Sequence, residues 1–433
     1  MNGNIVSPLK RKFAYSSQTQ SNRNTALLIA IAIVLVVVIA WSSQAAAQSK
    51  EPIKIGILLP KSGTYTVQGE NGHNGAMLAV EDFGGQVLGR PVQLIWEDES
   101  TPPESVQRMR KMIEVDKVVA IDGGISSGDI LAMMPVALQN KVLLMASGPN
   151  ATEITGKDCN RYTFRVDLPS HVTVRAIYPT LADNGKNKRW YFLSASYAWG
   201  IDSYNQMRDY LKANDASATI VGQDQAPLGT TDFSAFLLKL RSYNPQVAWV
   251  TFGGSDLTNF LKQFQGIGMT GKVLISSPIV NDSDLWAAGP QAATGTYPKL
   301  WNYTGPYNTP KSQAFAKKYQ QKFGEPPEVE AWQDWFGMTS ILTAIQKTGS
   351  TDSKKLVQFL EGYKFDGYKD MPIYFRSWDH QLLQPVLVTK VKPKITDKFD
   401  YFDVLAEFPK GGAKDLDSFY GTKQEIGCNM GPL

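Results

Sequence analysis

The sequence has few of the residues that build metal sites or disulfide-rich scaffolds. Its 433 residues include two cysteines, Cys159 and Cys428, and three histidines. The histidines, His73, His171 and His380, lie far apart and show none of the short spacings of a metal site. We therefore predict no metal site, no bound cofactor and no scaffold that depends on many disulfides.

Acidic residues are absent from the first 47 positions, which have the layout of an export signal. Four basic residues, the last of them Arg23, precede an apolar run at 26–41, and three alanines end at Ala47. This order predicts a signal peptide over residues 1–47, cleaved after Ala47, and so a periplasmic protein. The apolar run is slightly shorter than the ~20 residues that usually span a bilayer, and an uncleaved N-terminal membrane anchor is the alternative.

Removing this leader also removes the excess of positive charge. The whole chain has 44 Lys and Arg against 40 Asp and Glu, and the leader holds four of the basic residues, which leaves 40 of each sign. A balanced chain gives no electrostatic reason to bind nucleic acid. Export also places Cys159 and Cys428 in an oxidising compartment, where a lone pair usually forms a disulfide; two buried free thiols are the alternative.

Short apolar runs alternate with longer amphipathic runs along the mature chain. Its length of about 385 residues is more than one hydrophobic core normally serves. The first series has expected strands at 53–59, 92–96, 118–121 and 142–145 and expected helices at 72–83, 104–115 and 129–138. A second series has strands at 190–193, 219–221, 247–252 and 273–275 and helices at 201–211, 233–241 and 257–265, and it is followed by a long helix at 329–347 and strands at 372–375 and 385–391. The alternation predicts an α/β fold of two doubly wound parallel sheets, with any ligand in the cleft between them.

The corner at 121–128, where an expected strand gives way to an expected helix, admits two functions. Gly124-x-Ser126-x-Gly128 matches the turn that exposes the nucleophilic serine of α/β-hydrolases. The same corner is also an anion-binding site, because free backbone N–H groups and the positive end of the helix dipole face a ligand there. A hydrolase that uses Ser126 needs a later acid and histidine and an oxyanion motif of His followed by glycines, and that motif is absent. We therefore expect no catalytic residues and keep the hydrolase as the least favoured reading.

Several short motifs follow one another in a fixed order. Residues 53–63 read IKIGILLPKSG, followed by Gln68-Gly69, Asn74-Gly75, Gly84-Gly85, TEIT at 152–155, YAWG at 197–200, DFSA at 232–235 and TGS at 348–350. This series resembles the periplasmic binding proteins of the leucine/isoleucine/valine-binding type, which are the receptors of branched-chain-amino-acid-type ABC importers. The resemblance covers essentially all of the mature chain.

The resemblance implies the type I periplasmic binding protein fold, two doubly wound parallel-sheet lobes joined by a three-strand hinge that close around a ligand. The N-terminal lobe would cover 51–166 and 297–376, and the C-terminal lobe 167–296 and 377–433. The implied partners are a small-molecule ligand and an ABC permease in the inner membrane, and we expect a monomer. The cysteine pair would join the first crossover to the tail, as in some family members that bind aromatic acids.

The resemblance also implies a ligand site. The first lobe would hold the ligand's carboxylate through Ser127, with Ser126 beside it, and through small or polar residues after the fourth strand, namely Ala146, Ser147 and Asn150. Hydroxyls and backbone N–H groups suit a carboxylate without needing a buried positive charge. Helix capping is the alternative for Ser126 and Ser127, since serine is a preferred N-cap residue.

The remaining positions come from both lobes. Gln68, and less strongly Tyr65, match a place where the family sets a side chain over the ligand, although Gln68 also fits a solvated loop. Trp199 matches a tyrosine of the second lobe in a loop after a strand, and it suits stacking on a ring or packing under the next helix. Ser255, with Asp256 beside it, and Pro278 match the tyrosine and acid that clamp an amino acid's ammonium group.

The acid of that clamp is missing, and an unpaired ammonium in a closed cleft is costly. We therefore rank ligands without an α-amino group first. We expect a small organic acid first, preferably an aromatic carboxylate, then a branched-chain or other amino acid, then a urea or short amide. A membrane-tethered ligand sensor is the alternative class and would need the uncleaved anchor. Trp332, Trp335 and Phe336 lie at helical spacing, and we expect them in the core rather than in the site.

Overall fold

The computed structural model describes residues 1, 3, 51–183 and 185–433. The predicted signal peptide or anchor lies outside the described residues, apart from two isolated positions. Residues Pro52–Leu433 form one unit by their internal contacts. Within the described residues, no helix has the length and apolar character needed to cross a membrane.

A six-stranded sheet forms the first half of the unit. Its strand order is β2-β3-β1-β4-β5-β6. The strands are β1 (Ile53–Leu58), β2 (Gln86–Val87), β3 (Arg90–Glu97), β4 (Ala120–Gly123), β5 (Leu143–Ala146) and β6 (Thr163–Arg165). All neighbours pair in parallel except β2, which is antiparallel to β3. Parallel pairing requires crossover connections, which the intervening helices provide.

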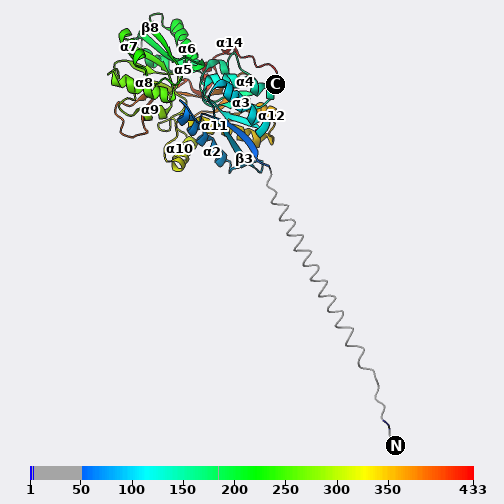
Figure 1. Cartoon of the computed structure of the whole chain (residues 1–433). Coiled ribbons are helices and arrows are strands. Elements are labelled where there is room, and N and C mark those ends of the chain that lie inside the picture. The colour runs from blue at the N-terminus through cyan, green and yellow to red at the C-terminus, as the bar shows by residue number, and fades with distance from the viewer. Residues whose placement is uncertain (2, 4–50, 184) are drawn as a thin grey trace. The chain divides into compact units, whose positions relative to one another are not determined.

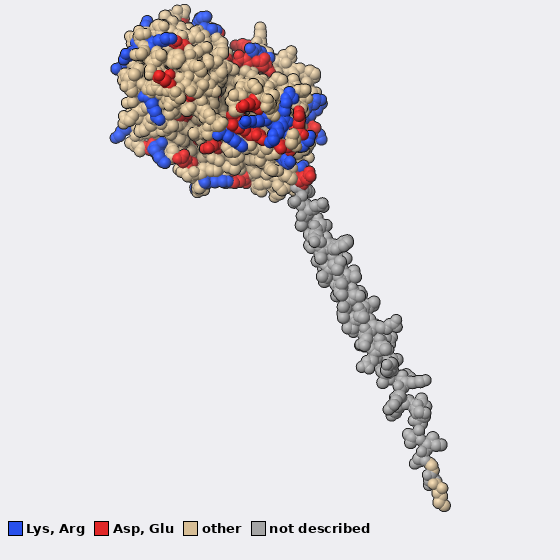
Figure 2. All heavy atoms as spheres, viewed as in Figure 1, with Lys and Arg blue, Asp and Glu red and all other residues tan. Residues whose placement is uncertain are grey.

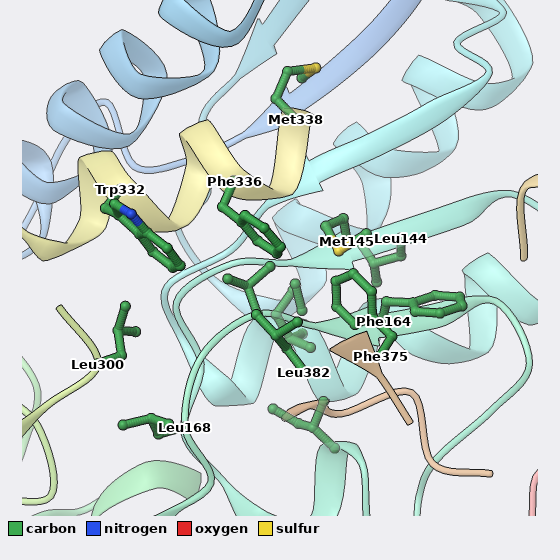
Figure 3. Packing of buried hydrophobic residues seen from close by; sticks show 14 of the residues in the cluster. Leu144, Met145, Phe164, Leu168, Leu300, Trp332, Phe336, Met338, Phe375 and Leu382 are labelled. Atoms are coloured by element: carbon green, nitrogen blue, oxygen red, sulfur yellow. The ribbon is translucent and has the colours of Figure 1, made fainter. Parts of the chain in front are cut away.

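The helices of this half come from two distant parts of the chain. They are α2 (Thr66–Asp82), α3 (Pro102–Lys111) with a π-helical turn (Met112–Asp116), α4 (Ser127–Asn140), α10 (Pro310–Phe323), α11 (Val329–Thr348) and α12 (Ser353–Leu360). Helices α2 and α11 pack closely because α2 presents glycine: a Cβ on Gly75 would lie 2.0 Å from the Ala331 carbonyl oxygen. Figure 3 shows Phe336 of α11 directed toward β5 and β6, where Met145 and Phe164 lie, whereas Trp335 packs on Phe315 of α10.

A four-stranded parallel sheet forms the second half, with the order β10-β9-β7-β8. Its strands are β7 (Arg189–Ala195), β8 (Thr219–Ala226), β9 (Val247–Thr251) and β10 (Leu274–Ser276). Its helices are α5 (Ser170–Ala182), α6 (Ala198–Asn214), α7 (Ser234–Tyr243), α8 (Gly254–Gly266) and α9 (Asp282–Ala288). One face of this sheet has a separate hydrophobic core around Phe233, Phe252 and Phe260.

Two small antiparallel sheets complete the unit. One has the order β11-β15-β16 (Thr296–Lys299, Val386–Val391 and Phe402–Phe408), and the other the order β12-β13-β14 (Lys364–Phe365, Ile373–Phe375 and Leu382–Leu383). The tail carries α13 (Leu416–Tyr420) and α14 (Lys423–Ile426). A disulfide joins Cys159 to Cys428, as expected, across a sequence separation of 269.

The predicted α/β fold with two parallel sheets is confirmed. We call the six-stranded sheet with α2, α3, α4, α11 and α12 the first lobe, and the four-stranded sheet with α6, α7, α8 and α9 the second lobe. Figure 1 shows α6, α7, α8 and α9 gathered on one side and α3, α4 and α12 on the other. On the face drawn in Figure 2, basic and acidic side chains are interspersed. The hinge positions and lobe boundaries given above stay a prediction.

Candidate functional site

A pocket lies where the two lobes meet. About 410 Å³ in and at the mouth of this pocket is free of protein atoms, and part of that space is open to solvent. The first lobe lines it with Tyr65, Ile125, Gly148, Asn150 and Glu330, the second lobe lines it with Trp199, Phe252, Gly253, Ile279, Val280, Asn281 and Asp284, and Asp167 follows β6. This pocket, called the interlobe pocket below, is at the carboxyl ends of the strands of both sheets, where open α/β sheets bind ligands.

Three of the ten predicted binding residues line the interlobe pocket: Tyr65, Asn150 and Trp199. Trp199 lies within the first turn of α6 rather than in a loop, is 6% exposed, and has an indole N–H without a partner in the described residues. Ser126 instead borders a more open hollow that it shares with Tyr65. Ser127, Ala146 and Ser147 are buried, and neither hollow includes them.

The predicted anion-binding corner is occupied by a carboxyl group of the protein itself. The backbone N–H groups of Ile125 and Ser126 each donate at 2.8 Å to the carboxylate of Glu99. Glu99 is buried, and both burial and the negative charge of Asp129 raise its pKa. Two N–H groups of this corner are therefore satisfied without a ligand.

The two corner serines have structural partners. The Ser126 hydroxyl accepts from the Asp129 N–H at 3.4 Å and caps α4, the alternative weighed for it from the sequence. The Ser127 hydroxyl accepts from the Ala151 N–H at 3.1 Å. No histidine among the described residues hydrogen-bonds to Ser126, so the hydrolase arrangement is not assembled here. A contact of either serine with a ligand stays a prediction.

The charged groups lining the interlobe pocket are all acidic: Asp167, Asp284 and Glu330, without a lysine, arginine or histidine among the lining residues. All three are at most 2% exposed. One oxygen of Asp284 and one of Glu330 have no hydrogen-bond partner in the described chain. Unpaired acceptors at the wall of a pocket are available to a ligand that carries N–H donors.

Burial is the main cause of the pKa shifts of these carboxyl groups. It raises the pKa of Asp167 to about 8. It also raises the pKa of Glu330, with a further rise from the charge of Asp334, and the pKa of Asp284, with a further rise from Glu328. With a pKa of about 8, Asp167 holds its proton near neutral pH unless a positive charge compensates it.

More carboxylates lie behind the lining on the first-lobe side. Glu328, immediately before α11, and Asp334, one turn beyond Glu330, are fully buried, and burial raises the pKa of each to about 7. Neither oxygen of the buried Asp122 has a partner in the described residues. Gly148 gives Glu330 its room, because a Cβ there would lie 2.6 Å from a Glu330 oxygen. No group of histidine, cysteine or acidic residues among those described has the arrangement of a metal site.

Aromatic side chains supply the apolar wall of the pocket. Tyr65, Trp199 and Phe252 are all buried. The hydroxyl of Tyr65 lies 2.5 Å from that of Tyr197, which joins the first lobe to the second. A side chain on Gly253 would lie 2.9 Å from the Tyr65 ring, so glycine permits this close approach.

Further hydrogen bonds link the lobes around the pocket. The Gln68 amide donates to Asp284 at 2.7 Å and to the Ser283 hydroxyl at 3.0 Å. The Ser255 N–H donates to the Thr64 carbonyl at 3.1 Å. The chain is therefore in a closed form, in which Gln68 and Ser255 bridge the lobes.

Two carboxyl groups also accept hydrogen bonds from the opposite lobe. Glu328 accepts from the Ser283 N–H at 3.1 Å, and Asp202 of α6 accepts from the Thr152 N–H at 2.9 Å. Asp256, the predicted substitute for the ammonium clamp, accepts instead from the Gly229 N–H at 2.8 Å within the second lobe. Asp256 therefore holds the loop around Gly229 through this hydrogen bond.

The sequence analysis did not identify the pocket carboxylates. Asp167 follows β6 and Asp284 lies in α9, two short elements that were not predicted. Glu330 lies on a helix that was assigned to the core because of its tryptophans. The available signal was Glu330 and Asp334 in this apolar helix, with Glu328 just before it, because acidic residues are almost never fully buried unless they are paired.

Known proteins show the same architecture. The sequence profile of the periplasmic binding proteins matches residues 52–398. The chain belongs to this family. It is therefore a solute-binding receptor and not an enzyme, and the family to which it belongs is periplasmic.

Three proteins are similar to this chain over most of its length. The chain is 24% identical over 388 residues to a protein named Leu/Ile/Val-binding protein homolog 6 from Brucella melitensis, covering 87% of this chain and 96% of that one. A periplasmic binding protein from Burkholderia mallei has a TM-score of 0.79 and 26% identity, covering 88% of this chain and all of that one. A solute-binding protein of an ABC transporter from Rhodopseudomonas palustris, solved with 3,4-dihydroxybenzoic acid, has a TM-score of 0.75 and 23% identity, covering 83% and 98%.

Proposed function

We propose that this protein is the extracytoplasmic receptor of an ABC importer and that its ligand is a small molecule with an ammonium group, an amino acid first. The observation that carries this is the lining of the interlobe pocket, where Asp167, Asp284 and Glu330 face the space without a basic side chain. A cation in a closed pocket needs compensating charge, which these carboxyl groups supply in their ionised form.

The rest of the pocket suits the body of such a ligand. The apolar side chain lies against Tyr65, Trp199 and Phe252, all buried. The ligand's carboxylate lies at the end of the pocket formed by Gly148 and Asn150. The serine hydroxyls expected from the sequence, Ser127 and Ser147, are buried beyond the lining residues.

This proposal reorders the ligands expected from the sequence. An aromatic carboxylate came first because the acid of the ammonium clamp was missing, and Asp284 and Glu330 now provide acids from other elements. In addition, Glu99 already fills two N–H groups of the corner. A urea or short amide remains the second candidate, because its N–H groups suit the same unpaired acceptors.

The ligand stabilises closure in this scheme by touching both lobes. Glu330 and Asp167 bind it from one side and Asp284 and Trp199 from the other, so binding selects the closed form from an open one. The remaining expectations belong to the same proposal: lobe boundaries as given above, a monomer, delivery to a permease, and export by cleavage after Ala47. Sequencing the mature N-terminus tests the last, since an intact leader favours the tethered sensor.

A ligand panel tests the ligand class. Isothermal titration calorimetry and thermal unfolding with leucine, valine, benzoate, urea and acetamide should show binding by the amino acids. Saturation by benzoate without any response to amino acids or amides contradicts the ammonium assignment and restores the aromatic carboxylate.

The affinity for an ammonium ligand should rise as the pH increases from 6 to 8. Asp167 has a pKa of about 8, so it is mostly protonated at pH 6, and a cation binds its ionised form. Binding should therefore release protons, which calorimetry in two buffers of different ionisation enthalpy measures. An affinity that is flat over this range, with no proton release, points to an amide or urea.

Glu99→Ala should unmask the corner to external anions. The change leaves the N–H groups of Ile125 and Ser126 without their acceptor, and we expect a loss of about 1–3 kcal/mol in the free energy of unfolding. Acetate at high concentration should restore part of the melting temperature of this variant and not of wild type. Glu104→Ala, on the exposed first turn of α3, is the matched control; the absence of rescue by acetate contradicts the anion site.

A further inference from the structure

Three consecutive residues at the start of α9 each have a partner outside that helix. Asp282, Ser283 and Asp284 are at most 8% exposed, and we call them the α9 turn. Two of them contact the first lobe, one lines the interlobe pocket, and one is tied to strand β11. At the α9 turn, contact with a ligand and contact between the lobes therefore depend on the same few residues.

Gln68 of α2 gives the two oxygens of Asp284 different surroundings. The Gln68 amide donates to Oδ1 at 2.7 Å, whereas Oδ2 has no partner among the described residues. Asp284 lines the interlobe pocket, and Gln68, which is 1% exposed, does not. Burial and the charge of Glu328 raise the pKa of Asp284, and the hydrogen bond from Gln68 opposes that rise. Gln68 thus favours the ionised form of Asp284 and leaves one oxygen for a ligand.

The first lobe holds the α9 turn at a second point. The Gln68 amide also donates to the Ser283 hydroxyl at 3.0 Å, and the Ser283 N–H donates to the Glu328 carboxyl group at 3.1 Å. Glu328 immediately precedes α11, and α11 packs against α2, the helix of Gln68, at Gly75 and Ala331. The two groups that hold the α9 turn therefore belong to one packed pair of helices.

The α9 turn is also fixed to α8 and β11. Asp282 forms an ion pair with Lys299 of β11 at 2.5 Å, and both side chains are at most 2% exposed. The Thr258 hydroxyl of α8 donates to the Asp284 carbonyl at 3.0 Å. Breaking a buried ion pair is costly, so we expect the α9 turn to move together with α8 and β11. Its contacts with Gln68 and Glu328 then form only when the lobes close.

We propose that Gln68 is a positioning residue that aims Asp284 at the ligand only when the lobes are closed. This inference rests on the proposed function, in which Asp284 binds an ammonium group. In an open form the Gln68 amide is separated from Asp284, which loses the donor that fixes its carboxyl group and favours its ionisation. Closure then strengthens ligand binding, and a bound ligand favours closure, although Gln68 itself touches no ligand.

The distance between the lobes tests this inference in the whole protein. Spin labels at Glu104→Cys of α3 and Leu238→Cys of α7, both exposed positions, report that distance by double electron–electron resonance, without ligand and with each member of the ligand panel. Gln68→Leu removes the donor and keeps a side chain of similar size, and we expect the ratio of closed to open molecules to fall about tenfold. Glu70→Gln, on an exposed residue of the same helix, is the matched control and should not change the ratio.

Asp284→Asn separates the contact between the lobes from the contact with the ligand. Its amide oxygen still accepts from Gln68, so this variant without ligand should close as wild type does, while its affinity for leucine falls. A role of Gln68 in folding alone would lower the melting temperature of Gln68→Leu and leave the lobe distances unchanged.

Equal distances in Gln68→Leu and wild type, or a wild type that stays open with every member of the panel, overturn the inference. A wild type that closes with benzoate or urea but not with leucine contradicts the proposed ligand instead, and Gln68→Leu is then compared with wild type in the ligand that closes it.

Discussion

Glu330→Gln should lower the affinity for an ammonium ligand by about 10- to 100-fold. A hydrogen bond between charged groups contributes about 1.5–3 kcal/mol, and the neutral amide keeps the shape of the side chain but not its charge. Adding Asp284→Asn removes a second acceptor on the opposite lobe, and the double variant should bind too weakly to saturate. Isothermal titration calorimetry at pH 8, where the carboxyl groups are most ionised, gives the largest difference.

The same variant should not lose stability, which separates a binding role from a structural one. Glu330 has an oxygen without a partner and lies near the charge of Asp334, so a neutral side chain relieves repulsion in the free protein. We expect an equal or higher melting temperature. Glu325→Gln, on an exposed residue before the same helix, should change neither property. A Glu330→Gln protein that binds amino acids as tightly as wild type contradicts the assignment.

Buried acids also set the pH dependence of the free protein. A carboxyl group whose pKa is raised from 3.8 to about 8, as in Asp167, binds a proton in the folded chain that the unfolded chain releases. Stability from this group is therefore lost as the pH rises from about 4 to about 8. A cationic ligand replaces those protons. It should therefore stabilise the protein most at high pH, where the ligand-free protein has the lowest free energy of unfolding.

The fold was predictable because its strands and helices alternate with regular spacing. The parallel strands β1, β4 and β9 lie within about two residues of the expected positions, since short apolar runs bounded by polar residues mark buried strands. Helix α2 begins at Thr66, whereas the sequence predicted a start at 72. The first turns were missed because glycines such as Gly69 and Gly72 have low helix propensity. Contact with Asp334 of α11 explains Gly72, a contact that is not local in the sequence, whereas Gly69 lies against the Pro60 carbonyl.

The sequence predicted only those residues of the site that lie in or near the family's motifs. Tyr65, Asn150 and Trp199 came from the resemblance and line the interlobe pocket. The carboxylates did not, because Asp167 and Asp284 are separated from Glu330 along the chain and meet only once both lobes have folded. Glu99 shows the same limit: the corner was identified as an anion site, but the sequence did not show that a carboxyl group of the chain itself occupies it.

Removing the disulfide with Cys159→Ser and Cys428→Ser should lower the free energy of unfolding by about 2–5 kcal/mol. The bond closes a loop with a sequence separation of 269, so it restricts the unfolded chain strongly. Both cysteines are buried, and the Arg161 guanidinium also holds the tail through the Gly431 carbonyl at 2.8 Å. Denaturant unfolding of the double variant, compared with wild type under oxidising conditions, measures the loss.

The affinity for ligand should not change in the double variant, because neither cysteine lines the interlobe pocket. Wild type with a reductant should lose the same stability as the double variant, and the double variant should not respond to the reductant. Equal stability of the two proteins under oxidising conditions contradicts a stabilising bond. A loss of ligand affinity without a loss of stability instead assigns the bond to closure of the lobes, because Cys159 lies just before β6, the strand that leads to Asp167.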